Sequence, residues 1–172
     1  MKQSTTTFLK GTIFITGIIV LSLFTFLLPG LATDAAEMNP GYTYLRFPVL
    51  IGLYITAIPF FLALYHAWTL LNYIESENAF SKLSVMALGH IKSYAILIII
   101  LYVIGLFMLM LQNALHPGIA IIGTVIIFST LVISVFAAVL QELLRSALEI
   151  KSENDLTVCG DEMSIIINVD VM

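Results

Sequence analysis

Charge is scarce in this sequence. Only 10% of the 172 residues are charged, with seven Lys and Arg against 11 Asp and Glu, while 60% are hydrophobic and the mean hydropathy is +1.05. An ordinary soluble domain carries roughly 25% charged residues. One small core cannot bury this much apolar surface, so the composition excludes a soluble globular protein and predicts that lipid is the solvent. The basic residues are scattered singly, which argues against direct binding of nucleic acid.

Residues that ligate metals or act as nucleophiles are also few. Cys159 is the single cysteine, so no intrachain disulfide is possible, and there are three histidines. A metal site needs three or four ligands, and a nucleophilic site needs a base beside its nucleophile. The sequence carries no motif typical of hydrolases, zinc proteases or nucleotide-binding folds. We therefore expect neither an enzyme nor a bound cofactor or metal.

What the sequence does have is four long uncharged intervals. Each is long enough to cross a hydrocarbon core of about 30 Å as a helix of about 20 residues. A polar turn that ends in Pro117 and Gly118 separates the last two. The sequence thus predicts an all-α integral membrane four-helix bundle in up-and-down order, with the lipid bilayer as its main partner. The predicted spans are residues 8–31, 47–74, 91–111 and 119–141.

The orientation follows from the basic residues. Six of the seven Lys and Arg lie near the amino terminus, in or next to the second loop, or after the fourth span, and only Arg46 belongs to another loop. Because Lys and Arg favour the cytoplasmic side, we expect a multi-pass protein of the bacterial cell membrane with both termini in the cytoplasm. The alternative for the first span is a cleaved signal peptide. Its apolar stretch exceeds the 7–15 residues typical of such peptides, so we expect it to be retained.

His66 is the one ionisable residue placed well inside a predicted span, and such residues are functional candidates by default. Tyr65, Trp68 and Tyr73 surround it in the sequence. A belt of aromatic side chains at the membrane interface accounts for all four, and titration or ligand binding by His66 is the alternative. His90 is expected to be a wetted residue near the interface.

Two segments depart from the lipid-facing pattern, both on the predicted cytoplasmic side. Ser81 is the predicted N-cap of a helix that begins in the cytoplasm and continues into the third span. The last helix is predicted to extend past the membrane, with Glu142, Arg145 and Glu149 able to pair on one face. On the other face runs an apolar stripe that needs a cover, from the second loop or from another subunit, so a homo-oligomer is one alternative. The stripe consists of Phe136, Leu140, Leu143, Leu144, Ala147 and Leu148.

Residues 48–61, 79–81, 135–141 and 150–158 resemble the YoaS-like family, bacterial membrane proteins of unknown function. The similarity covers nearly all of residues 1–158. The resemblance implies a four-span protein, commonly encoded beside a small helix-turn-helix regulator of the Cro/C1 type. Its most specific part is taken as the candidate partner-interaction segment, namely Glu153, Asn154, Asp155, Leu156 and Thr157.

These features divide the chain into a four-span domain, residues 1–158, and a short tail, residues 159–172. Ile and Val alternate with polar residues near the end of the tail, so a lone strand or a disordered segment is predicted there. Our leading hypothesis is a non-enzymatic membrane protein that sequesters a cytosolic helix-turn-helix regulator or relays a membrane state to it. The alternative is a small transporter or immunity-type protein that acts on membrane-active compounds.

Overall fold

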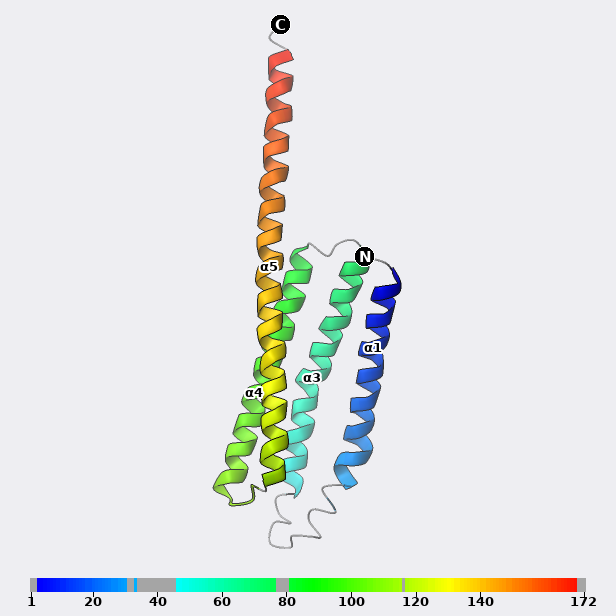
Figure 1. Cartoon of the computed structure of the whole chain (residues 1–172), viewed down its shortest axis with the longest axis vertical. Helices are drawn as coiled ribbons and strands as arrows, with labels where there is room; N and C mark the ends of the chain where they lie inside the picture. The colour runs from blue at the N-terminus through cyan, green and yellow to red at the C-terminus, as the bar shows by residue number, and fades with distance from the viewer. Residues whose placement is uncertain (1–2, 31–32, 34–45, 77–80, 116, 170–172) are drawn as a thin grey trace.

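The computed structural model describes the backbone of residues 3–30, 33, 46–76, 81–115 and 117–169, and the side chains of these residues except 3–5, 27, 46 and 155–169. Its helices run alternately up and down side by side (Figure 1). Four of them are long and apolar enough to cross a membrane, which confirms the predicted all-α four-span architecture. The elements are α1 (Gln3–Ser22), the π-helical segment η1 (Leu23–Leu27), α3 (Arg46–Glu75), α4 (Lys82–Leu111) and α5 (Pro117–Val169).

Local hydrogen bonds define both ends of α4. At its start the Ser81 side chain accepts a hydrogen bond of 3.3 Å from the Ser84 N–H, as predicted for an N-cap. At its end Asn113 adopts a left-handed conformation, with φ of 53°, which asparagine tolerates better than most residues. The N–H groups of Asn113 and Ala114 then bind the carbonyls of Met110 and Leu109, each at 3.1 Å. This Schellman motif ends α4 and leads the chain into α5.

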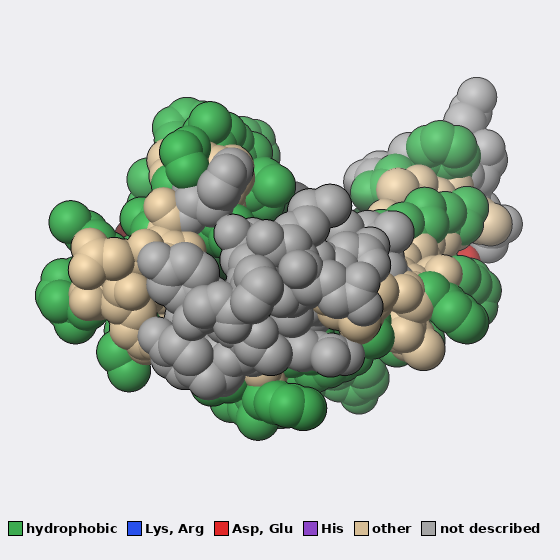
Figure 2. Space-filling view, turned by 90° about the horizontal axis from the view of Figure 1, so that it is seen from below, with side chains coloured by type: hydrophobic (Ala, Val, Ile, Leu, Met, Phe, Trp, Pro, Cys, Tyr) green, Lys and Arg blue, Asp and Glu red, His purple; other side chains and the backbone are tan. Residues whose placement is uncertain are grey.

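The bundle has small side chains inside and large ones outside. Phe14, Phe107 and Phe128 are each about two-thirds exposed, as residues facing lipid would be. Figure 2 shows hydrophobic side chains projecting outward around the described helices. Close approach through small residues is how membrane helices gain packing energy without a hydrophobic driving force between them. Small residues account for most of the buried positions: Thr6, Thr56, Ala57, Ser84, Ala87, Ala95, Ser134 and Ala137.

Helix α1 lies at the edge of the bundle against α3. A Cβ added at Gly17 would lie 3.3 Å from the Leu64 side chain, so the two helices are close there. Further along, the Tyr54 hydroxyl donates a 3.0 Å hydrogen bond to the Phe24 carbonyl in η1. A π-helical turn offsets the helical hydrogen-bond ladder and leaves carbonyls available to such donors. These contacts join α1 to α3, but most of the surface of α1 stays open to lipid.

Helices α4 and α5 pack through a row of α5 side chains spaced three and four residues apart, which is the geometry of antiparallel helices crossing at a shallow angle. The two helices are close at Gly123, because a Cβ there would lie 2.9 Å from Leu106 Cδ2. The prediction that the apolar stripe of α5 is covered along its whole length was partly wrong. Leu144, Ala147 and Leu148 are half-buried, but Phe136, Leu140 and Leu143 are exposed. The small side chains of Ser134 and Ala137 form the buried row instead, since they allow the closer approach.

Helix α5 is much longer than its neighbours. It has 53 residues against 30 in α3 and 30 in α4, so at 1.5 Å per residue it is about 35 Å longer. Figure 1 shows the additional length continuing alone past the other helices. The prediction of a strand or disordered tail after residue 158 was wrong as far as Val169, where the backbone is helical. Extending an existing helix needs no new nucleus, and this outweighs the period-two pattern of the tail.

Candidate functional site

One end of the bundle, called the polar end here, collects most of the polar interactions between helices. The start of α1, the end of α3, the start of α4 and the continuation of α5 all lie there (Figure 1). Both ends of the described chain are thus on one side of the bundle, as an even number of spans requires. Which side of the membrane this is remains a prediction.

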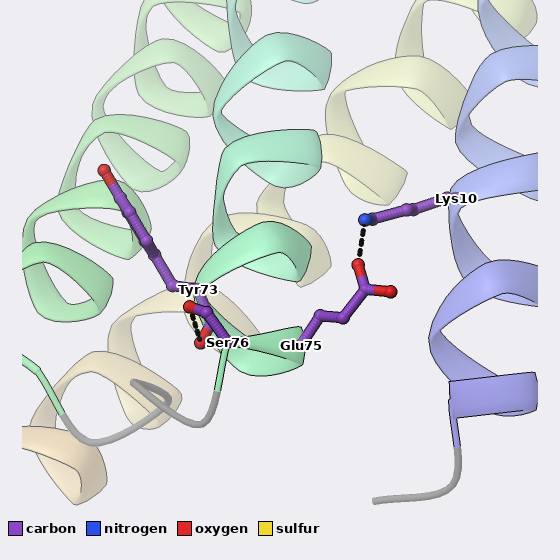
Figure 3. A network of polar contacts seen from close by, with 4 residues as sticks. All are labelled: Lys10, Tyr73, Glu75 and Ser76. Atoms are coloured by element: carbon purple, nitrogen blue, oxygen red, sulfur yellow. Dashed lines mark hydrogen bonds and ion pairs between the residues drawn. The ribbon is translucent and has the colours of Figure 1, made fainter.

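At the polar end an ion pair joins α1 to α3. Lys10 Nζ contacts Glu75 Oε2, as Figure 3 shows, and the side chains are 19% and 38% exposed. The same ammonium lies 5.7 Å from the centre of the Trp68 ring, within the range of a cation–π interaction. Ser76 Oγ donates a 3.1 Å hydrogen bond to the Tyr73 carbonyl and closes the last turn of α3. Trp68 is therefore part of a helix–helix contact as well as of the predicted aromatic belt.

Two histidines from different helices stack between α3 and α4. The rings of His66 in α3 and His90 in α4 lie 4.6 Å apart and within 10° of parallel. Tyr94 extends the stack, 5.6 Å from His66. The sequence did not predict this contact, although it carried a signal for it. His66 and His90 lie equally far from the middle of the second loop, so an antiparallel pair of helices places them level. No group of three metal-ligating side chains occurs among the described residues.

Gln141 is the main polar contact between α4 and α5. Its Nε2 donates a 3.3 Å hydrogen bond to the Val85 carbonyl, and the amide lies directly against Gly89. Beside it is an open depression of about 310 Å³ between the two helices. The residues that line this depression are Met86, Gly89, His90, Lys92, Ser93 and Gln141.

Replacing Gly89 with alanine tests the Gln141 contact. The new Cβ would lie 2.7 Å from Gln141 Nε2, so the amide must leave Val85. Loss of one such hydrogen bond in a membrane protein is worth about 1 kcal/mol, which offsets the similar gain of alanine over glycine in a helix. We expect Gly89→Ala to leave the free energy of unfolding in SDS unchanged, whereas Gly105→Ala on the same helix, with open space around it, raises that energy.

A double-mutant cycle completes this test. In a Gln141→Ala background the collision is absent, so Gly89→Ala should raise the free energy of unfolding as Gly105→Ala does. Equal effects of Gly89→Ala in both backgrounds contradict a role for Gln141.

The candidate partner-interaction segment lies on the projecting part of α5. Glu153 and Asn154 are exposed, and the backbone at Asp155, Leu156 and Thr157 is helical, although those three side chains lie outside the described part. The structure does not bring this segment to the other polar residues of the bundle. Of the charged residues predicted to pair before it, Arg145 and Glu149 do so, at 3.5 Å.

Comparison with known proteins identifies the family. The model of the family described as "Protein of unknown function (DUF2975)" matches residues 30–158. The chain belongs to the DUF2975 family. It is also 51% identical over 160 residues to the "Uncharacterized membrane protein YoaS" of Bacillus subtilis (strain 168), covering 92% of this chain and 100% of that protein. No solved structure gives a significant match.

The DUF2975 match covers three of the four candidate spans. It begins at residue 30, so it includes α3, α4 and the first part of α5 and leaves α1 outside. It ends at residue 158, where the resemblance noted in the sequence also ends. The family match, the relative's name and four candidate spans agree that this is a multi-pass membrane protein. Neither name describes an enzymatic activity.

Proposed function

We propose that this chain is a non-enzymatic membrane protein whose projecting α5 helix holds a cytosolic helix-turn-helix transcription regulator at the membrane. The observation that carries the proposal is the length of α5. This helix is about 35 Å longer than α4, against which it packs. A helix that leaves the bundle contributes nothing to the packing of the membrane spans. Presentation of a surface to a soluble partner is a use that fits this arrangement.

The chemistry of the projecting part supports a protein partner. Leu143 and Ile150, which follow the last contact of Gln141 with α4, are 64% and 63% exposed. Charged residues lie beside them, with Glu149 paired to Arg145 and Glu153 exposed. Apolar anchors bordered by charge are typical of helices that dock on a partner. The proposal places this part of α5 in the cytoplasm, in agreement with the distribution of Lys and Arg.

Recovery of the regulator with the membrane protein tests the proposal. The full chain, purified from native membranes, should carry the helix-turn-helix protein encoded beside it. The double variant Glu153→Ala/Asp155→Ala should recover about tenfold less, a loss of about 1.4 kcal/mol, because two acidic side chains of the candidate segment are removed. Quantitative mass spectrometry of the purified sample provides the measurement.

The matched control is Asp161→Ala/Glu162→Ala, which removes the same charge from the same helix just after the family match ends. It should recover the regulator as the full chain does. Absence of any DNA-binding protein from the wild-type sample contradicts the proposal. If deletion of the protein then also changes cell sensitivity to membrane-active compounds, the transporter or immunity-type alternative is favoured.

A further inference from the structure

The depression between α4 and α5 lies at the level where a membrane meets water. The uncharged part of α4 from Ser93 to Leu111 is about 28 Å long at 1.5 Å per residue, close to the thickness of the hydrocarbon core. Lys92 is the residue immediately before this stretch. A lysine at that position lies at the depth of the phospholipid headgroups, and its side chain borders the depression.

Lys92 has no carboxylate to pair with among the described residues. The ion pairs there are Lys10 with Glu75 and Arg145 with Glu149, and no acidic side chain lines the depression. An ammonium at the edge of the hydrocarbon core is poorly solvated, so it favours an anion as a neighbour. The protein therefore offers a half-buried cation, open to lipid, whose counter-ion must come from outside this set of residues.

Other donors line the same depression. Gln141 Nε2 has two protons and uses one on the Val85 carbonyl, so a second proton is available. His90 contributes a ring N–H, and its ring is held in position by stacking on His66. Ser93 is already engaged, because its hydroxyl donates to the Gly89 carbonyl at 3.0 Å. An ammonium with two neutral donors around an open hollow fits a phosphate group.

We propose that this depression binds the phosphate of an anionic phospholipid, with Lys92 supplying the charge and His90 and Gln141 supplying hydrogen bonds. The open side of the hollow faces the surroundings of the bundle, so the acyl chains can lie along exposed apolar side chains of α4 and α5. Basic pockets between transmembrane helices bind anionic headgroups in this way. The inference does not depend on the regulator hypothesis, because it uses only residues within the four-span bundle.

Lipid binding to the full chain in a neutral detergent tests this inference. Native mass spectrometry should show that phosphatidylglycerol binds about fivefold more tightly than phosphatidylcholine with the same acyl chains, as expected for one lysine contact. Lys92→Gln should remove this preference and Lys92→Arg should keep it. Lys82→Gln, which changes the other lysine of α4, should bind as the wild type does.

Three results overturn the inference. The first is equal affinity of the wild-type protein for the two lipids, which is decisive even if the Lys92 variants do not fold. The second is a preference that persists in folded Lys92→Gln. The third is full displacement of phosphatidylglycerol by an equal concentration of inorganic phosphate, which shows that the hollow takes a free anion and that the lipid assignment is wrong.

Discussion

Replacing Gly123 with leucine should separate α4 from α5 and lower the free energy of unfolding by about 3 kcal/mol. Gly123 is buried, and an added Cβ alone would lie 2.9 Å from Leu106 Cδ2 and 3.0 Å from Cδ1. Leucine adds three further carbons in the same place. Leu106 can move for a single methyl group, but the larger side chain forces the backbones apart.

The measurement is the free energy of unfolding during titration of detergent-solubilised protein with SDS. Gly105→Leu is the matched control, because Gly105 is next to Leu106 on α4 and has open space around it. This variant should unfold at the same SDS fraction as the wild type or a higher one. If both leucine variants unfold alike, Gly123 is not a point of close approach.

A compensating variant separates the steric cause from a general effect of substitution. Gly123→Ala alone should destabilise less than leucine does, and Leu106→Ala alone should leave a gap. Because the alanine methyl at position 123 fills part of that gap, the double variant should lose less stability than the sum of the single variants. Strict additivity contradicts direct contact between these two side chains.

The four spans could be predicted because charge is rare and its positions are informative. Gaps between charged residues gave span positions that agree with the helices, since placing a charge in hydrocarbon is costly and few sequences do it without a functional reason. The Ser81 cap was predictable for a similar reason, because the cap is a local hydrogen bond between neighbours in sequence. Features that depend on residues near one another in the sequence, such as the spans and the helix cap, could therefore be predicted.

Contacts between helices were harder to predict, because they depend on the rotation of each helix about its axis. A glycine does not by itself indicate a close approach, since Gly52 is exposed and an added Cβ there would have nothing within 4 Å. The glycines close to another helix are Gly17, Gly89 and Gly123, where a side chain of that helix fills the space. Because the rotation of each helix about its axis was unknown, the buried face of α5 was predicted only in part and the His66–His90 stack was not predicted. In lipid both faces of a helix are apolar, so hydrophobic periodicity does not identify the buried face.

Reversing the charge of Lys10 should release α1 from α3. In Lys10→Glu the carboxylate faces Glu75, so an attraction becomes a repulsion at a site where both side chains are partly shielded from water. Exposed ion pairs contribute up to about 1 kcal/mol and buried ones several times more when one partner is lost, so we expect a loss of about 2 kcal/mol. Because α1 buries little of its surface, this loss should detach α1 and leave α3, α4 and α5 together.

Two measurements follow this release. Amide hydrogen exchange should accelerate at the start of α1 and stay slow in α4, and the emission of Trp68, the single tryptophan, should change as the Lys10 ammonium leaves its ring. Lys151→Glu, which reverses a charge on an exposed part of α5, should change neither. The double variant Lys10→Glu/Glu75→Lys preserves the net charge of the polar end, so it should restore slow exchange in α1. If the swap instead exchanges as fast as Lys10→Glu does, the pair does not hold α1, and its attachment depends on the contacts at Gly17 and η1.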